Sequence, residues 1–229
     1  MKESVEEGAG RMQLLRRHWY TIGGLVAIAT IMYLVLEWRH LAISSALLIA
    51  NFAALLIHQF EEYGWPGGEP AIMNLVLQPS KKPERYPLNQ NSAMVVNVLV
   101  AYGFYLLPVF FPRIFWLGIA PTLFGFGQFI VHGIVTPRKL GKIYNPGLAA
   151  VVLLHFPIGI AYLCSIVQTG DVHVTDWMLG VVYMAAFMVI TLQKMTYQWL
   201  VSENSPYPFA PDEMRRFDVQ GKLARKNDK

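Results

Sequence analysis

Six stretches of the sequence are apolar over about 20 residues each, the length that an α-helix needs to cross the hydrocarbon core of a bilayer. Hydrophobic residues make up 54% of the chain and charged residues only 15%, so a soluble core could not hide this much apolar surface. The sequence therefore predicts an all-α fold, an integral membrane bundle of six transmembrane helices. They are expected at Tyr20–Trp38, Leu41–Phe60, Asn91–Phe111, Ile114–Val135, Leu148–Val167 and Trp177–Thr196.

The distribution of lysine and arginine predicts the orientation, because cytoplasmic segments of membrane proteins keep an excess of these residues. With the amino terminus inside, all 19 lysines and arginines except Arg39 and Arg113 lie on or near the inner side. We therefore expect both termini in the cytoplasm and the protein in the plasma (inner) membrane. Residues 1–19 are predicted as a cytoplasmic segment, 20–200 as the six-helix domain, and 201–229 as a polar cytoplasmic tail at the surface or disordered.

Several classes of function are disfavoured by composition and motifs. The net charge of +4 does not indicate a nucleic-acid partner, since the basic residues lie in the gaps between apolar stretches. The single cysteine, Cys164, excludes a disulfide or a cysteine-based zinc site. The sequence also has no Walker-type glycine loop, G-x-S-x-G elbow, H-E-x-x-H or CxxC, which argues against ATP-driven work and serine hydrolysis.

Ionisable residues close the second apolar stretch, in the run His58-Gln59-Phe60-Glu61-Glu62. Helical spacings of three and four residues put the imidazole and the two carboxylates on one broad face. Such groups are costly at membrane depth, so they are candidates for a functional site. Imidazole and carboxylate together suit zinc, iron or manganese. A metal-free acid/base pair is the alternative.

Further polar residues are expected at the same depth, in the cytoplasmic half of other helices. His132 is the second candidate histidine, because it lies on the fourth stretch near its inner end. Five others are candidates for contacts around the ligands: Asn97, Gln128, Tyr144, Asn145 and His155. For some of them a structural role is an open alternative. Asn145 followed by Pro146 reads as a helix N-cap with proline at the first helical position, and His155 precedes the helix-kinking Pro157.

The segment between the second and third helices, residues 64–90, is rich in glycine and proline and is long for a loop without a function. It contains the apolar run Ala71-Ile72-Met73-Asn74-Leu75-Val76-Leu77. We interpret it either as a re-entrant segment that covers the site or as an amphipathic stretch on the headgroups.

A resemblance to a known family rests on several of these motifs. The run from His58 to Glu62, the following Tyr63-Gly64-Trp65-Pro66-Gly67-Gly68, the later His132, and Tyr144-Asn145-Pro146-Gly147 resemble the pattern of the HXXEE-domain family of membrane proteins. The resemblance extends roughly from Leu41 to Pro157. It implies a metal-binding or catalytic site, but neither a reaction nor a substrate.

These observations predict a membrane-embedded metal-dependent enzyme with its site near the cytoplasmic face. His58, Glu61, Glu62 and His132 would hold one or two divalent metals (Fe, Zn or Mn), with a free carboxylate of Glu61 or Glu62 as the catalytic base. The substrate is expected to be lipid-like or apolar and to enter from the bilayer. Two alternatives stay open: a small carrier or proton-coupled permease, because buried acids and histidines also form proton relays, and a structural protein without catalysis.

Overall fold

The computed structural model describes residues 2–228, which form helices and connecting segments without a strand. Within these residues six helices are long and apolar enough to cross a membrane, which confirms the predicted six-helix all-α fold. They are Gly10–Glu37, Ile43–Tyr63, Gln90–Phe110, Phe115–Leu140, Leu148–Thr169 and Val174–Trp199. The second to sixth helices lie within about five residues of the predicted ranges, whereas the first is part of a helix that begins further upstream.

The first two spans are uninterrupted helices, α1 (Lys2–Glu37) and α2 (Ile43–Tyr63). Each of the other four combines α-helical and π-helical segments. The third consists of α4 (Gln90–Met94), η2 (Val95–Ala101) and α5 (Tyr102–Phe110), and the fourth of α6 (Phe115–Phe129), η3 (Ile130–Val135) and α7 (Thr136–Leu140). The fifth consists of α8 (Leu148–Ala150), η4 (Val151–His155) and α9 (Phe156–Thr169), and the sixth of α10 (Val174–Met188) and η5 (Val189–Trp199).

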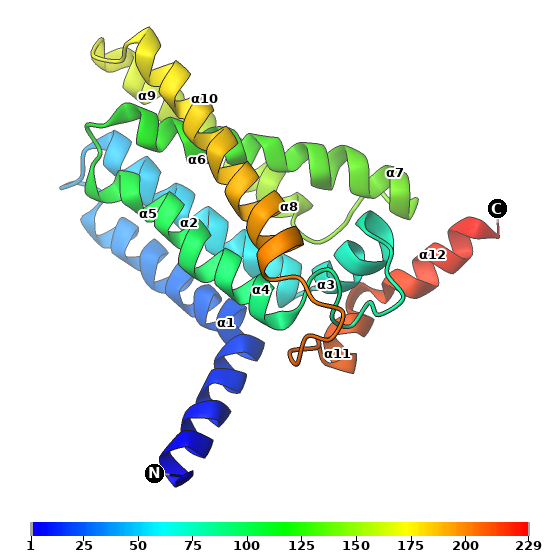
Figure 1. Cartoon of the computed structure of the whole chain (residues 1–229). Helices are drawn as coiled ribbons and strands as arrows, with labels where there is room; N and C mark the ends of the chain where they lie inside the picture. The colour runs from blue at the N-terminus through cyan, green and yellow to red at the C-terminus, as the bar shows by residue number, and fades with distance from the viewer. Residues whose placement is uncertain (1, 229) are drawn as a thin grey trace.

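The central helix of the bundle is α2, which packs against α1, α5 and α9 (Figure 1). In the most apolar part of α2, 56% of the residues are buried, whereas the corresponding share in the sixth span is 17%. Leu56 of α2 belongs to a core cluster with Phe104, Tyr105, Ala120 and Phe187 from neighbouring helices. The side chains near the end of α2 are therefore enclosed by other helices instead of facing lipid.

π-helical turns carry three of the polar residues singled out in the sequence. Asn97 lies in η2, His132 in η3 and His155 in η4. Such turns insert an extra residue into the helical repeat and are often found at functional sites. The π-helical turns thus coincide with the polar positions of three different spans.

The segment after α2 folds back over the end of that helix. It contains α3 (Glu69–Ala71) and η1 (Ile72–Leu77), which pack against α11 and α7 respectively. Asn74 is fully buried: its amide donates to the carbonyls of Pro83 (2.7 Å) and Leu88 (2.8 Å) and its oxygen accepts from the Leu88 backbone N–H (3.0 Å). This single side chain ties the rest of the segment to η1.

The polar tail is helical and lies at the surface with a few buried anchors, which is the first of its two predicted forms and not the disordered one. It forms α11 (Pro211–Arg215), a 3₁₀ turn η6 (Arg216–Asp218) and α12 (Val219–Asn227), which lie beside α3 and α7 (Figure 1). Phe209 and Val219 are buried, and the Glu213 carboxylate accepts hydrogen bonds from Gln90 Nε2 and the Ala210 backbone N–H, both at 2.7 Å. A few apolar anchors and one buried acid therefore hold this segment against the bundle.

Candidate metal centre

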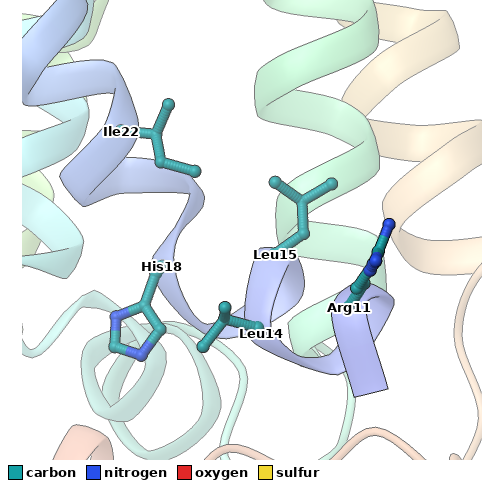
Figure 2. Close-up of a pocket in the computed structure, with 5 residues that line it drawn as sticks. All are labelled: Arg11, Leu14, Leu15, His18 and Ile22. Atoms are coloured by element: carbon teal, nitrogen blue, oxygen red, sulfur yellow. The ribbon is translucent and has the colours of Figure 1, made fainter. Parts of the chain in front are cut away.

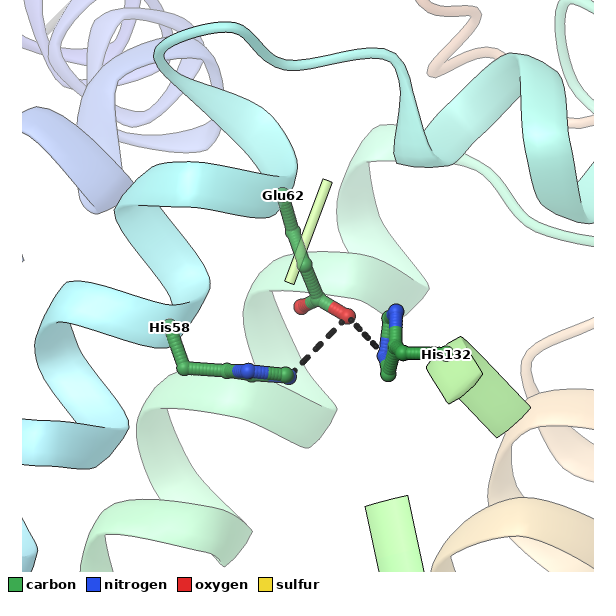
Figure 3. Close-up of side chains that lie close together, drawn as sticks. All are labelled: His58, Glu62 and His132. Atoms are coloured by element: carbon green, nitrogen blue, oxygen red, sulfur yellow. Dashed lines mark ion pairs between the residues drawn. The ribbon is translucent and has the colours of Figure 1, made fainter. Parts of the chain in front are cut away.

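Three side chains converge at the end of the bundle that α3 and α11 cover, and we call them the His–Glu cluster: His58, Glu62 and His132. His58 and Glu62 lie one turn apart on α2, and His132 projects from η3. The Nε2 atoms of both histidines lie 3.3 Å from the same oxygen, Oε1 of Glu62 (Figure 3). All three residues are buried, and one potential ligand atom from each lies within 4.8 Å of the others. Within residues 2–228 this is the one group found that could hold a metal ion.

The backbone carbonyl of Gly147 fixes the tautomer of His58. Nδ1 of His58 lies 3.2 Å from this oxygen. Because a carbonyl oxygen only accepts hydrogen bonds, Nδ1 carries the proton and donates it. In the neutral ring, Nε2 then presents its lone pair to the cluster.

The side chain of Asn145 fixes the tautomer of His132 in the same way. Asn145 Nδ2 donates to the backbone carbonyl of His132 (2.6 Å), so its other atom, Oδ1, is the one that faces the ring. Oδ1 lies 2.9 Å from Nδ1 of His132 and can only accept, so this Nδ1 also carries a proton. Asn145 is fully buried. It holds His132 as partners of metal-bound histidines commonly do, through the nitrogen remote from the metal.

Three acceptors therefore face one another if both rings are neutral: two imidazole lone pairs and a carboxylate oxygen. Such an arrangement needs a positive charge between or on these groups, either a cation or additional protons. The separations fit a cation. Metal–ligand distances of about 2.0–2.2 Å place neighbouring tetrahedral ligands about 3.4 Å apart, close to the observed 3.3 Å. The donor set of two imidazoles and one carboxylate is suited to zinc, iron or manganese.

Gly147 lies directly against both rings. Its φ of +97° lies outside the range that L-residues adopt readily. A Cβ at this position would lie 2.6 Å from Cε1 of His132 and 3.0 Å from Cε1 of His58. Only glycine lets the backbone approach both rings this closely, so the Asn145-Pro146-Gly147 turn helps to position the histidines and also begins α8.

Glu61 occupies a different place from the one predicted for it. Its carboxylate accepts hydrogen bonds from the backbone N–H groups of Ala149 (3.2 Å) and Ala150 (2.8 Å), and from the hydroxyl of Tyr144 (2.9 Å). These contacts cap the first turn of α8. Both burial and the bond to Glu61 raise the pKa of Tyr144, which stays a donor. The carboxylate of Glu61 is therefore engaged in positioning α8, and Glu62 is the acid that joins the histidines.

The remaining predicted residues lie around the cluster at different distances. His155 is buried, its ring centroid lies 5.6 Å from that of His58, and its Nδ1 lies 3.2 Å from Oδ1 of Asn51. Asn97 accepts a hydrogen bond from Gln59 (3.1 Å) and so braces α2 against η2. Gln128 is half-buried on α6. These three residues lie outside the group that could hold a metal.

Sequence reasoning missed one acidic residue, Glu69. It is 6% exposed, and its Oε2 has no hydrogen-bond partner among the described residues. Burial raises the pKa of Glu69 well above the usual range, the negative charge of Glu62 raises it further, and His132 lowers it. The only signal in the sequence is position, because Glu69 directly follows the Gly67-Gly68 pair of the family-like run.

A separate hollow lies along α1 and shares no residue with the cluster. It is lined by Arg11, Leu14, Leu15, His18 and Ile22 (Figure 2). All five come from a single helix, and the leucines are exposed on a helix that is long and apolar enough to cross a membrane. The hollow is therefore part of the outer surface of α1.

A comparison of the sequence with models of protein families agrees with the resemblance that the motif suggested. A family model described as a protein of unknown function with HXXEE motif matches residues 49–162, from α2 to α9. No curated protein and no solved structure matches the chain. The matched segment holds His58, Glu62, His132, Asn145 and Gly147, that is, the whole cluster and the groups that orient it. By this domain, the chain belongs to the HXXEE family.

Proposed function

We propose that this chain is a membrane-embedded metal-dependent enzyme whose divalent cation is bound by His58, Glu62 and His132. The observation that carries the proposal is the convergence of two imidazole Nε2 atoms on one carboxylate oxygen, with both Nδ1 protons already committed elsewhere. A set of acceptors arranged in this way inside a membrane bundle is stabilised by a cation.

The residues at the proposed site have three kinds of role: binding the ion, orienting the histidines and positioning α8. His58, Glu62 and His132 bind the ion, while Gly147 and Asn145 keep each imidazole in the ligating tautomer. Glu61 holds the first turn of α8, and with it the turn that contains Gly147. When bound, a divalent cation supplies Lewis acidity toward a substrate oxygen or a water molecule. Three protein ligands leave a coordination position for that oxygen, as in catalytic zinc sites.

The proposed substrate is a lipid-like or apolar small molecule that reaches the site from the bilayer. Two large apolar residues support this, because they lie exposed on the segments that border the cluster: Trp65 is 77% exposed and Ile143 is 86% exposed. Tryptophan in particular is enriched at the level of the headgroups. A site beside such residues lies where the polar end of an amphiphile is found. The side of the membrane, which we propose to be cytoplasmic, follows from the basic residues alone.

Metal content of the purified protein tests the proposal. Wild-type protein loaded with Zn²⁺ or Mn²⁺ and then dialysed is expected to retain about one ion per chain, and His58→Ala, Glu62→Ala and His132→Ala are expected to lose it. His155→Ala is the matched control, since it removes another buried histidine that lies outside the group. Retention of the ion in all three ligand variants, or a wild-type protein that binds none, would contradict the metal site.

A proton-coupled carrier is the second candidate function. It is favoured by the position of His155 next to the cluster. With His58 and His132 it forms a row of three buried histidines, with ring centroids 5.0 Å and 5.6 Å apart along the row. Rows of this kind relay protons in transporters. Metal-free protein in liposomes that dissipates a pH gradient, and loses this activity as His155→Ala, would support the carrier; absence of flux would exclude it.

A further inference from the structure

The chain reverses direction immediately after the HXXEE run. The backbone N–H groups of Gly64 and Trp65 both donate to the carbonyl of Phe60, at 2.7 Å and 2.9 Å, and that of Gly67 donates to the carbonyl of Glu61 at 3.0 Å. These bonds fold the segment back onto the last turn of α2. The next residue but one after Gly67 is Glu69, which is thereby brought to the end of the helix that carries Glu62.

The tail fixes this reversal from the other side. Arg216 donates to the backbone carbonyl of Tyr63 and to the hydroxyl of Tyr20. A Cβ on Gly67 would lie 2.6 Å from Cδ of Arg216, and one on Gly68 would lie 2.9 Å from its carbonyl oxygen. Both glycines have positive φ, +70° and +107°. The position of Glu69 is thus determined by packing on both sides.

The contacts of the Glu69 carboxyl do not explain why it is buried there. It is 6% exposed, and its Oε2 is buried without a hydrogen-bond partner in the part of the chain that the structure describes. No lysine or arginine among the described residues forms an ion pair with it. Glu69 is not one of the three residues whose ligand atoms lie within 4.8 Å of one another, but the reversal places α3 beside the last turn of α2, which carries Glu62. Its carboxyl would have to turn toward the cluster to share an ion with it. A buried carboxylate in this position is costly unless a positive charge compensates it.

We propose that Glu69 is a further cation-binding carboxylate of the site formed by His58, Glu62 and His132. The inference rests on the proposed metal function and adds a ligand from outside the HXXEE run. Its chemical consequence is charge balance. Two neutral imidazoles and two carboxylates carry a charge of −2, which one divalent cation neutralises, as a site in a low-dielectric bundle requires.

The donor set also narrows the class of ion. Two imidazoles with two carboxylates suit iron or manganese best, because their higher coordination numbers keep a position open for a substrate oxygen, whereas zinc held tetrahedrally by all four groups would have none. A site for copper(I) would be built from thiolate or thioether groups. Glu69 and Glu62 approach the ion from different segments, the former from α3 and the latter from α2. The ion therefore links the covering segment to the bundle, and its removal is expected to loosen α3.

Glu69→Gln tests this assignment, because the amide keeps the size of the side chain and removes its charge. Binding of Mn²⁺ and Zn²⁺ is measured by equilibrium dialysis, together with the rise in detergent melting temperature that each ion causes. We expect Glu69→Gln to weaken binding by at least about 10- to 100-fold, because removal of groups that merely hydrogen-bond to metal ligands already has an effect of that size, and to reduce the ion-induced rise. Glu213→Gln is the matched control: Glu213 is also buried but its carboxylate has two hydrogen-bond partners, so ion binding by this variant is expected to equal that of the wild type.

The possible outcomes separate this inference from the metal site itself. If the wild type binds the ion and Glu69→Gln binds it within twofold, Glu69 is not a ligand and the three-residue site stands. If the wild type binds neither ion, the metal function fails and the role of Glu69 fails with it. Should Glu69→Gln not fold, Glu69→Asp keeps the charge and shortens the reach. It is expected to bind the ion more weakly than the wild type, and unchanged binding would overturn the assignment.

Discussion

Replacing Gly147 by alanine tests how the cluster is held in place. The new Cβ would lie 2.6 Å from Cε1 and 2.8 Å from Nδ1 of His132, and 3.0 Å from Cε1 of His58. Non-bonded carbon atoms prefer separations of about 3.5–4.0 Å. Relieving the contact therefore requires the His132 ring to move by roughly 1 Å. Metal–ligand distances tolerate only about 0.2 Å, so His132 is expected to lose its ligating position.

The expected magnitudes have two parts. Forcing an L-residue into the left-handed half of the φ range costs about 1–2 kcal/mol of stability. Displacing an oriented ligand lowers metal affinity by about 10- to 100-fold, as the loss of outer-shell partners does elsewhere. Affinity is measured by competition with a chromophoric chelator in detergent, and stability by thermal denaturation of the metal-free protein.

Gly170→Ala is the control that separates these two parts. Gly170 also has a positive φ, +76°, but nothing lies within 4 Å of the position that its Cβ would take. It ends α9, away from the cluster. This variant is expected to lose stability and to keep its metal. If Gly147→Ala binds metal as tightly as Gly170→Ala, the carbonyl and close packing of Gly147 do not position the histidines, and our account of the cluster is refuted.

Three further predictions follow from individual contacts. Glu61→Gln keeps an acceptor oxygen for the backbone N–H groups of Ala149 and Ala150 and is expected to retain metal, whereas Glu62→Gln loses it; equal loss in dialysis would show that Glu61 is also a ligand. Asn74→Ala leaves Pro83, Leu88 and their segment without their buried partner, so it should cost about 1–3 kcal/mol and speed proteolysis between residues 78 and 88; an unchanged cleavage rate would contradict the role of Asn74. Single cysteines at Ser80 and Ser202 should resist an impermeant outside reagent in intact cells while one at Thr169 is labelled, and labelling at Ser80 would reverse the proposed orientation.

The transmembrane fold could be predicted from the sequence because the bilayer leaves few alternatives. Backbone polar groups in lipid must be satisfied within each segment, so long apolar stretches become helices. The gathering of His58 and His132 follows from the same reasoning, since both lie near the ends of spans that run in the same direction. Helical spacing and depth were sufficient to put them at one end of the bundle.

The separate roles of Glu61, Glu62 and Glu69 could not be predicted from helical spacing and depth. Glu61 and Glu62 are adjacent on one broad face of α2, and only their partners distinguish them: α8 for Glu61 and the histidines for Glu62. Glu69 lies in a segment whose reversal depends on contacts with the tail. Because the tail is polar in composition, its few buried anchors, Phe209 and Val219, are not apparent in the sequence. These tertiary contacts, which are absent from any local sequence pattern, determine where each of the three carboxylates lies.

X-ray absorption at the edge of the bound metal tests the central claim most directly, because it counts the imidazoles around the ion. For Zn²⁺-loaded and dialysed wild-type protein we predict two histidine ligands with the remaining first-shell atoms oxygen or nitrogen, and for His132→Ala treated in the same way we predict no bound Zn²⁺ and therefore no such spectrum. A wild-type spectrum without imidazole scattering, or a spectrum that His132→Ala leaves unchanged, would contradict a metal site formed by His58, Glu62 and His132.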